Sequence, residues 1–117
     1  MAGQNHHFSQ YAQEKIPYAI ARYVNETTRL YNVLDKQLAG KSFITGEYSI
    51  ADIASYPWIR SHEKQGQNLN DFPHVKSWFD RISLRPAVIQ AYAKAARINS
   101  SAAVTEAGKS ILFGQKS

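Results

Sequence analysis

The segment SIAD is the first candidate for chemistry, because it places Ser49 and Asp52 three positions apart. A serine and an aspartate could belong to a Ser-His-Asp hydrolytic triad, but no nucleophile elbow or glycine-rich oxyanion turn accompanies them. The same spacing makes a capping box, in which the serine hydroxyl and the carboxylate each accept a backbone hydrogen bond at a helix start. We interpret Ser49 and Asp52 as this structural motif and predict no catalytic residue in the chain.

Four histidines raise the question of a metal site. His6 and His7 are adjacent, so on a helix they point about 100° apart and do not share one ion easily. His62 and His74 lie far from them, without a carboxylate at ligand spacing. We predict no metal site.

Arg22 stands in YAIARYV, between Ile20 and Tyr23 on the apolar side of a helical pattern. One interpretation is a snorkelling arginine, whose stem covers apolar surface while its head reaches water. The other is a guanidinium at the wall of a cleft, where its planar fork suits a carboxylate. The spacing alone favours snorkelling.

A long helix over residues 17–39 is the element that would carry Arg22. Pro17 suits its first turn and Gly40 the position just after its end. Its apolar residues recur at steps of three and four. They are Ile20, Tyr23, Val24, Leu30, Tyr31, Leu34 and Leu38, together with Thr27.

Shorter helices follow a glycine-containing connector over residues 40–48. The capping box predicts a helix over residues 49–62, and residues 65–71 have the composition of a loop. Asp71 is the expected cap of the next helix, and Pro86 begins the last one.

The fold class predicted from these patterns is all-α, a helical bundle, because no alternating period-two stretch is long enough for a sheet. Trp58 and Trp78 fall on predicted buried faces and are therefore expected in the core. We divide the chain into a helical domain over residues 1–98 and a small, polar tail over residues 99–117.

The composition argues against two classes of protein, nucleic-acid-binding and membrane-spanning. The chain has 117 residues, 44% of them hydrophobic, a net charge of +5 and no cysteine. The basic residues are scattered rather than clustered, which argues against nucleic-acid binding. No apolar run reaches the roughly 18 residues of a membrane helix, and the start does not resemble a signal peptide. A chain without cysteine is compatible with a cytoplasmic setting.

Several motifs together resemble one family. In chain order they are GQNHHF at 3–8, IPYAIARY at 16–23, SIAD at 49–52, FPHVKSWFDRI at 72–82, RPAVIQA at 85–91 and ILFGQ at 111–115. The order resembles the C-terminal helical domain of glutathione transferases. The first two motifs and the last are similar to the nu-class disulfide-bond oxidoreductases related to the yeast prion protein Ure2.

The resemblance implies a glutathione-dependent enzyme that uses glutathione as a co-substrate, with thiol–disulfide exchange through a mixed disulfide. It implies that Arg22 reaches a glutathione carboxylate, which reverses the preference drawn from spacing alone. It also implies that Asn5, His6 and His7 lie near the substrate side of the site.

The family's thioredoxin-like domain, which activates the thiolate, has no counterpart in this sequence. Met1 stands where the family has an internal methionine before GQNHHF, so we expect a truncated chain that is inactive alone. The alternative is a stand-alone helical interaction module of the same fold. Either way, an exposed apolar face predicts a dimer or larger homo-oligomer.

Overall fold

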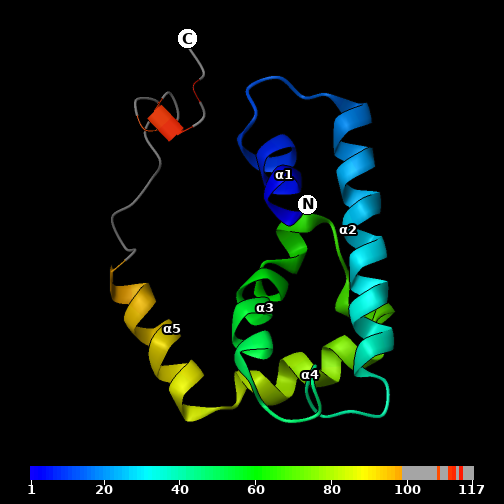
Figure 1. The fold of residues 1–117 in the computed structure, drawn as a ribbon. Helices are drawn as coiled ribbons and strands as arrows, with labels where there is room; N and C mark the ends of the chain where they lie inside the picture. Colours follow the sequence, from blue (N-terminus) through cyan, green and yellow to red (C-terminus); the bar gives the residue numbers. More distant parts are fainter. Residues whose placement is uncertain (99–107, 109–110, 113, 115–117) are drawn as a thin grey trace. The chain divides into compact units, whose positions relative to one another are not determined.

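The computed structural model describes residues 1–98, 108, 111–112 and 114 (Figure 1). Every secondary-structure element with more than two residues among them is a helix or a helical turn. The predicted all-α class is confirmed. In chain order the elements are α1 (Ala2–His6), the π-helical η1 (His7–Tyr11), α2 (Pro17–Leu38), α3 (Ile50–Arg60), the 3₁₀ turns η2 (His62–Gln65) and η3 (Leu69–Asp71), α4 (Pro73–Ser83) and α5 (Pro86–Ile98).

The chain divides into two compact units, Met1–Leu84 and Arg85–Ser117. The first unit holds α1 to α4, and α2 packs against both α1 and α4. The second holds α5, which begins at the predicted proline. Most of residues 99–117 lie outside the described part of the chain, so the proposed domain boundary after residue 98 stays a prediction. No described helix is both long and apolar enough to cross a membrane.

The capping box of α3 is confirmed. The Ser49 hydroxyl accepts a hydrogen bond from the Ala51 backbone at 3.3 Å, and the Asp52 carboxylate accepts one from the Ser49 backbone at 3.0 Å. Asp52 is fully buried and also accepts from the Trp78 indole at 2.7 Å. Burial acts to raise the pKa of Asp52, but these hydrogen bonds and one from the Ile44 backbone hold the pKa below its ordinary value. Ser49 and Asp52 therefore serve the fold.

The cap of α4 differs from the prediction. Phe72 occupies the N-cap position, without a side-chain hydrogen bond, and Asp71 belongs to the preceding turn η3. One oxygen of Asp35, on α2, accepts from the backbone N–H groups of His74 and Val75, each at 2.9 Å. The expected Asp71 cap was wrong because a carboxylate from another helix satisfies the first turn of α4.

The two tryptophans differ in burial. Trp78 is 0% exposed, as predicted, whereas Trp58 is 50% exposed, so its predicted core position was wrong. Tyr56 and Ile59 are the neighbours of Trp58 on α3 that turn inward instead. A helix of eleven residues cannot bury every apolar side chain it carries against one layer of neighbours.

A cluster of buried polar side chains joins the N-terminal segment to the rest of the first unit. We call it the polar cluster: Asn5, Thr27, Tyr31, Gln65 and Gln67. The predicted loop over residues 65–71 contributes two of its members, because Gly66 adopts φ 69° and lets the chain turn tightly between them. The sequence indicated a loop but gave no sign that its glutamines are interior.

Candidate functional site

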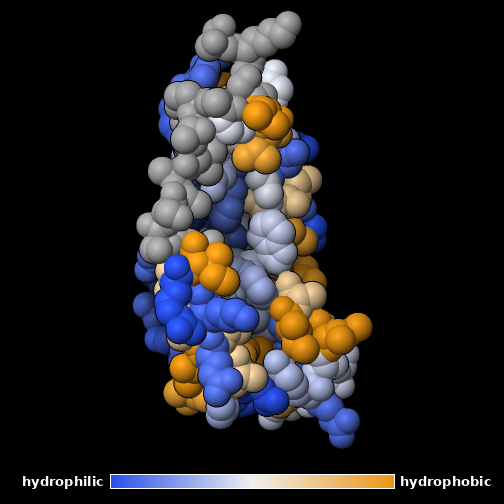
Figure 2. Space-filling view, turned by 90° about the vertical axis from the view of Figure 1, so that its left-hand side faces the viewer, coloured by the Kyte–Doolittle hydropathy of each residue, from blue (hydrophilic) through white to orange (hydrophobic). Residues whose placement is uncertain are grey.

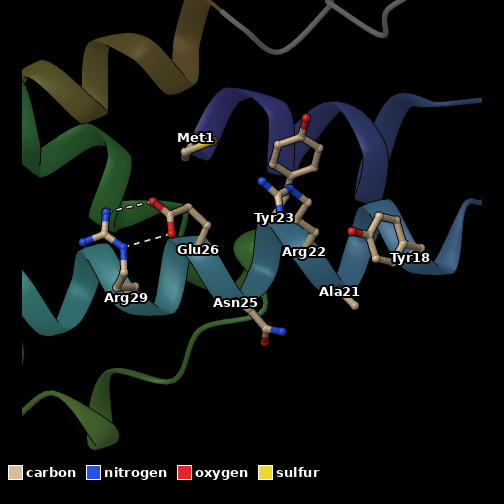
Figure 3. A pocket seen from close by; sticks show the side chains of 8 residues that line it. All are labelled: Met1, Tyr18, Ala21, Arg22, Tyr23, Asn25, Glu26 and Arg29. Atoms are coloured by element: carbon tan, nitrogen blue, oxygen red, sulfur yellow. Dashed lines mark hydrogen bonds and ion pairs between the residues drawn. The ribbon is translucent and has the colours of Figure 1, made fainter.

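An open hollow of about 560 Å³ lies along the N-terminal half of α2 (Figure 3). Most of its lining comes from residues of α2 spaced three or four apart, which places them on one exposed side of the helix. The lining residues are Met1, Tyr18, Ala21, Arg22, Tyr23, Asn25, Glu26 and Arg29. Arg22 is the one predicted site residue among them.

The two arginines of the hollow differ in how they are engaged. Arg29 donates two hydrogen bonds to the Glu26 carboxylate, at 2.9 and 2.8 Å, which lower the pKa of Glu26 (Figure 3). Arg22 is exposed and makes no hydrogen bond or ion pair with any described residue. Because Glu26 hydrogen-bonds Arg29 and not Arg22, the Arg22 guanidinium keeps its N–H donors available for an anionic group.

Tyr23 closes one side of the hollow next to Arg22. Its ring and the Arg22 guanidinium point to the side of α2 that faces α1 (Figure 3). The ring stacks on Phe8 with 5.3 Å between centroids, and the edge of Phe8 meets His7 at 5.0 Å. Among the residues expected on the substrate side, His7 thus connects to the hollow through two aromatic rings and does not line it.

Asn5 has a different place. It is 1% exposed, and its amide nitrogen donates to the Thr27 hydroxyl and to the Gln65 carbonyl, each at 3.0 Å. These bonds hold α1 against α2 and η2. The structure therefore gives Asn5 a role in positioning α1 beside the hollow, and its expected contact with substrate stays a prediction.

His6 does not line the hollow. Its ring faces Trp58, with 6.3 Å between ring centroids, and its Nε2 is buried without a hydrogen-bond partner among the described residues. Burial and the nearby Lys64 lower the pKa of His6. The neutral ring is therefore the favoured form, which suits packing rather than anion binding.

Sequence reasoning found Arg22 but missed Tyr18, Glu26 and Arg29. The signal was present, since Tyr18, Arg22, Glu26 and Arg29 follow one another at helical spacing along α2. The spacing alone could not identify a site, because polar residues at this spacing also mark the solvated face of any amphipathic helix. For metals, the described residues hold no group of three or more side chains that could bind an ion.

The sequence matches the family model of the glutathione S-transferase C-terminal domain over residues 10–86. It is 52% identical over 96 residues to the disulfide-bond oxidoreductase YfcG of Escherichia coli, covering 81% of this chain and 45% of that protein.

Two solved structures are similar in fold and sequence. A glutathione transferase family member from Pseudomonas fluorescens with two glutathione molecules bound gives a TM-score of 0.68 at 41% identity, covering 76% of this chain and 43% of that one. The transferase URE2P6 from Phanerochaete chrysosporium, in complex with oxidized glutathione, gives a TM-score of 0.76 at 30% identity, with 83% and 46% covered. The chain spans less than half the length of these relatives.

Proposed function

Because the chain belongs to the glutathione S-transferase family through its C-terminal domain, we propose that it forms the helical wall of a site for glutathione and its disulfide. The observation that carries this proposal is the unpaired Arg22 guanidinium in the hollow along α2. Glutathione is a tripeptide with two carboxylate groups, and an arginine fork binds a carboxylate through two parallel hydrogen bonds.

The lining of the hollow supports a positioning role. Arg22 holds a glutathione carboxylate, while Tyr18 and Tyr23 offer aromatic surface and phenol groups for the rest of the peptide. Glu26 is held by two hydrogen bonds from Arg29, and although its charge also acts on Arg22 it leaves all the N–H donors of Arg22 without a hydrogen bond to it. The described residues thus bind and orient a peptide-like anion.

The chemistry proposed for the complete enzyme is thiol–disulfide exchange. A glutathione thiolate attacks one sulfur of a disulfide, the S–S bond breaks, and the departing thiolate takes up a proton. The relative YfcG is a disulfide-bond oxidoreductase, and the sulfur atoms come from the ligands, which fits a chain without cysteine. The thiolate-activating group belongs to the thioredoxin-like domain that the family resemblance implies, so we expect no turnover from this chain alone. A cytoplasmic location is part of the same proposal.

The test is isothermal titration of the 117-residue chain with glutathione disulfide, comparing wild type with Arg22→Gln. Lys36→Gln is the matched control, because it removes one positive charge from the same helix about 21 Å away, at 1.5 Å per residue. We expect saturable binding that Arg22→Gln weakens roughly tenfold or more and that Lys36→Gln leaves unchanged.

Equal loss in both variants would show that net charge alone attracts the ligand. Absence of binding to the wild type would place recognition outside this chain. Either result would overturn the assignment of Arg22 to a carboxylate.

The second candidate function is a helical interaction module, and one observation favours it. Ile50 and Ile53, three positions apart on α3, are 83 and 54% exposed and form an exposed apolar stripe. Figure 2 shows that hydrophobic residues reach the surface on one face of the molecule. We propose that this stripe supports self-association. Sedimentation equilibrium of wild type and Ile53→Glu tests it. A dimer that the variant dissociates supports the module, whereas a monomeric wild type at high micromolar concentration contradicts it.

A further inference from the structure

A second hollow, of about 240 Å³, lies where the end of α2 and the following connector meet α4. We call it the α2–α4 hollow. It is lined by Leu38, Gly40, Lys41, Ser42, His74, Ser77 and Arg81. The three lining residues on α4 are spaced three and four apart, so they share one side of that helix and face the connector.

The charged residues of the lining are all positive. Lys41 and Arg81 carry positive charge, His74 and the two serines add hydrogen-bond donors, and no carboxylate lines the hollow. Asp35 contacts the start of α4, but its oxygen accepts from the backbone amides of His74 and Val75. A concave surface of this charge attracts anions.

Arg81 is held in place before any ligand binds. Its Nη1 donates to the Ser42 carbonyl at 2.6 Å and its Nη2 to the Ser77 hydroxyl at 3.4 Å, while its guanidinium lies 5.8 Å from the centre of the Phe43 ring. A guanidinium has five N–H donors, so these two bonds leave three for other acceptors. A fixed fork loses less side-chain entropy on binding than a free one.

Lys41 and Ser42, from the connector, line the facing wall and carry an ammonium and a hydroxyl group as further donors. Neither side chain has a hydrogen-bond partner among the described residues. The hollow thus combines a fixed arginine, a lysine and hydroxyl groups around a small volume, which suits an anion with several acceptor oxygens pointing in different directions.

We propose that the α2–α4 hollow binds a tetrahedral oxyanion, either free phosphate or the phosphate group of a phosphomonoester. Planar carboxylates fit it less well, because donors converge from two walls. This site is separate from the hollow along α2 that holds Arg22, where Glu26 already neutralises Arg29. The inference does not depend on glutathione binding.

The test is a titration of the ¹⁵N-labelled 117-residue chain with inorganic phosphate, followed by amide chemical shifts at constant ionic strength in a phosphate-free buffer. A parallel titration uses phenyl phosphate. Lys41→Gln is the test variant. Lys15→Gln is the matched control, since Lys15 precedes the other end of α2, about 33 Å away along its 22 residues.

We expect saturable shifts at residues 38–42 and 74–81, weakened roughly threefold to tenfold by Lys41→Gln and unchanged in Lys15→Gln and Arg22→Gln. Tighter binding of phenyl phosphate identifies a phosphomonoester as the ligand class, and equal binding identifies free phosphate. Shifts that sodium chloride reproduces, or equal affinity in Lys41→Gln and Lys15→Gln, would overturn the proposal. The Lys41 side chain makes no hydrogen bond or ion pair with the described residues, so its variant keeps the test independent of the Arg81 anchor.

Discussion

Two parts of the buried interior meet on α2 and are built differently. Near the N-terminal segment, the polar cluster packs through hydrogen bonds: Gln65 accepts from the Tyr31 phenol and donates to the Trp58 carbonyl, each at 2.8 Å. Between α2 and α4, the interior is apolar. We call that part the apolar cluster: Leu38, Val75, Trp78 and Ile82, all at most 1% exposed.

The two clusters contribute differently to the stability and to the arrangement of the helices. Burying apolar surface stabilises the fold but tolerates small shifts, because the hydrophobic effect has no direction. A buried hydrogen bond loses most of its value when a partner moves by an ångström, so a polar cluster specifies one arrangement. The polar cluster holds α1 against α2, beside the hollow that contains Arg22. The apolar cluster stabilises the fold between α2 and α4, away from that hollow.

The strongest way to break the apolar cluster is Trp78→Ala. We expect it to lower the free energy of unfolding by about 3–5 kcal/mol, since it empties a buried site and removes one of the two donors of the buried Asp52 Oδ1. Trp58→Ala should cost only about 1 kcal/mol, because half of that ring is already in water. Urea unfolding measures both. Equal losses would contradict the separation of the two tryptophans.

The polar cluster should break with Asn5→Ala. Two carbonyl or hydroxyl partners would lose their donor in the interior, and we expect a loss of about 2–3 kcal/mol. Asn32→Ala removes an exposed amide from α2 and should change stability by no more than about 0.5 kcal/mol. Urea unfolding monitored by circular dichroism separates these cases. A neutral Asn5→Ala would mean that the polar cluster does not fix α1.

The link between α2 and α4 can be sharpened with Asp35→Ala. Removing the carboxylate leaves two N–H groups of α4 without their acceptor, which should lower stability by about 1–2 kcal/mol. Asp71→Ala should be neutral to within about 0.5 kcal/mol. Thermal unfolding of the pair ranks the two carboxylates. The opposite ranking would restore Asp71 as the cap.

The smallest expected effect is a pH dependence from His6, next to the polar cluster. Burial and Lys64 lower its pKa below 6.5, so the unfolded chain binds more protons and the stability contributed by neutral His6 is present above about pH 6.5 and declines as pH falls through the lowered pKa. Unfolding free energies from pH 7.5 to 5.5 should decline in the wild type and decline less in His6→Gln. Parallel curves would rule out His6 as the source.

Local pattern was sufficient for much of the fold. The periodicity of α2, the capping box at Ser49 and the prolines at positions 17 and 86 each act through neighbours within a few residues, so sequence spacing predicts them. The buried Trp78 followed from the same helical spacing. Arg22 was recognisable as a site candidate because its motif resembles that of a known family. In the structure, Arg22 lines a hollow along α2.

Contacts between distant segments decided the rest. Asp35 caps a helix that begins 38 positions later, and Gln65 forms hydrogen bonds with residues on α1 and α2. Because these partners are distant in the sequence, no local pattern predicts either role. Trp58 and Trp78 look alike in sequence, but Trp78 is fully enclosed by its neighbours and Trp58 is half exposed. The α2–α4 hollow likewise exists because Lys41 and Arg81, forty positions apart, meet where two helices pack. Sequence determines which faces a helix offers, and tertiary packing decides what each face meets.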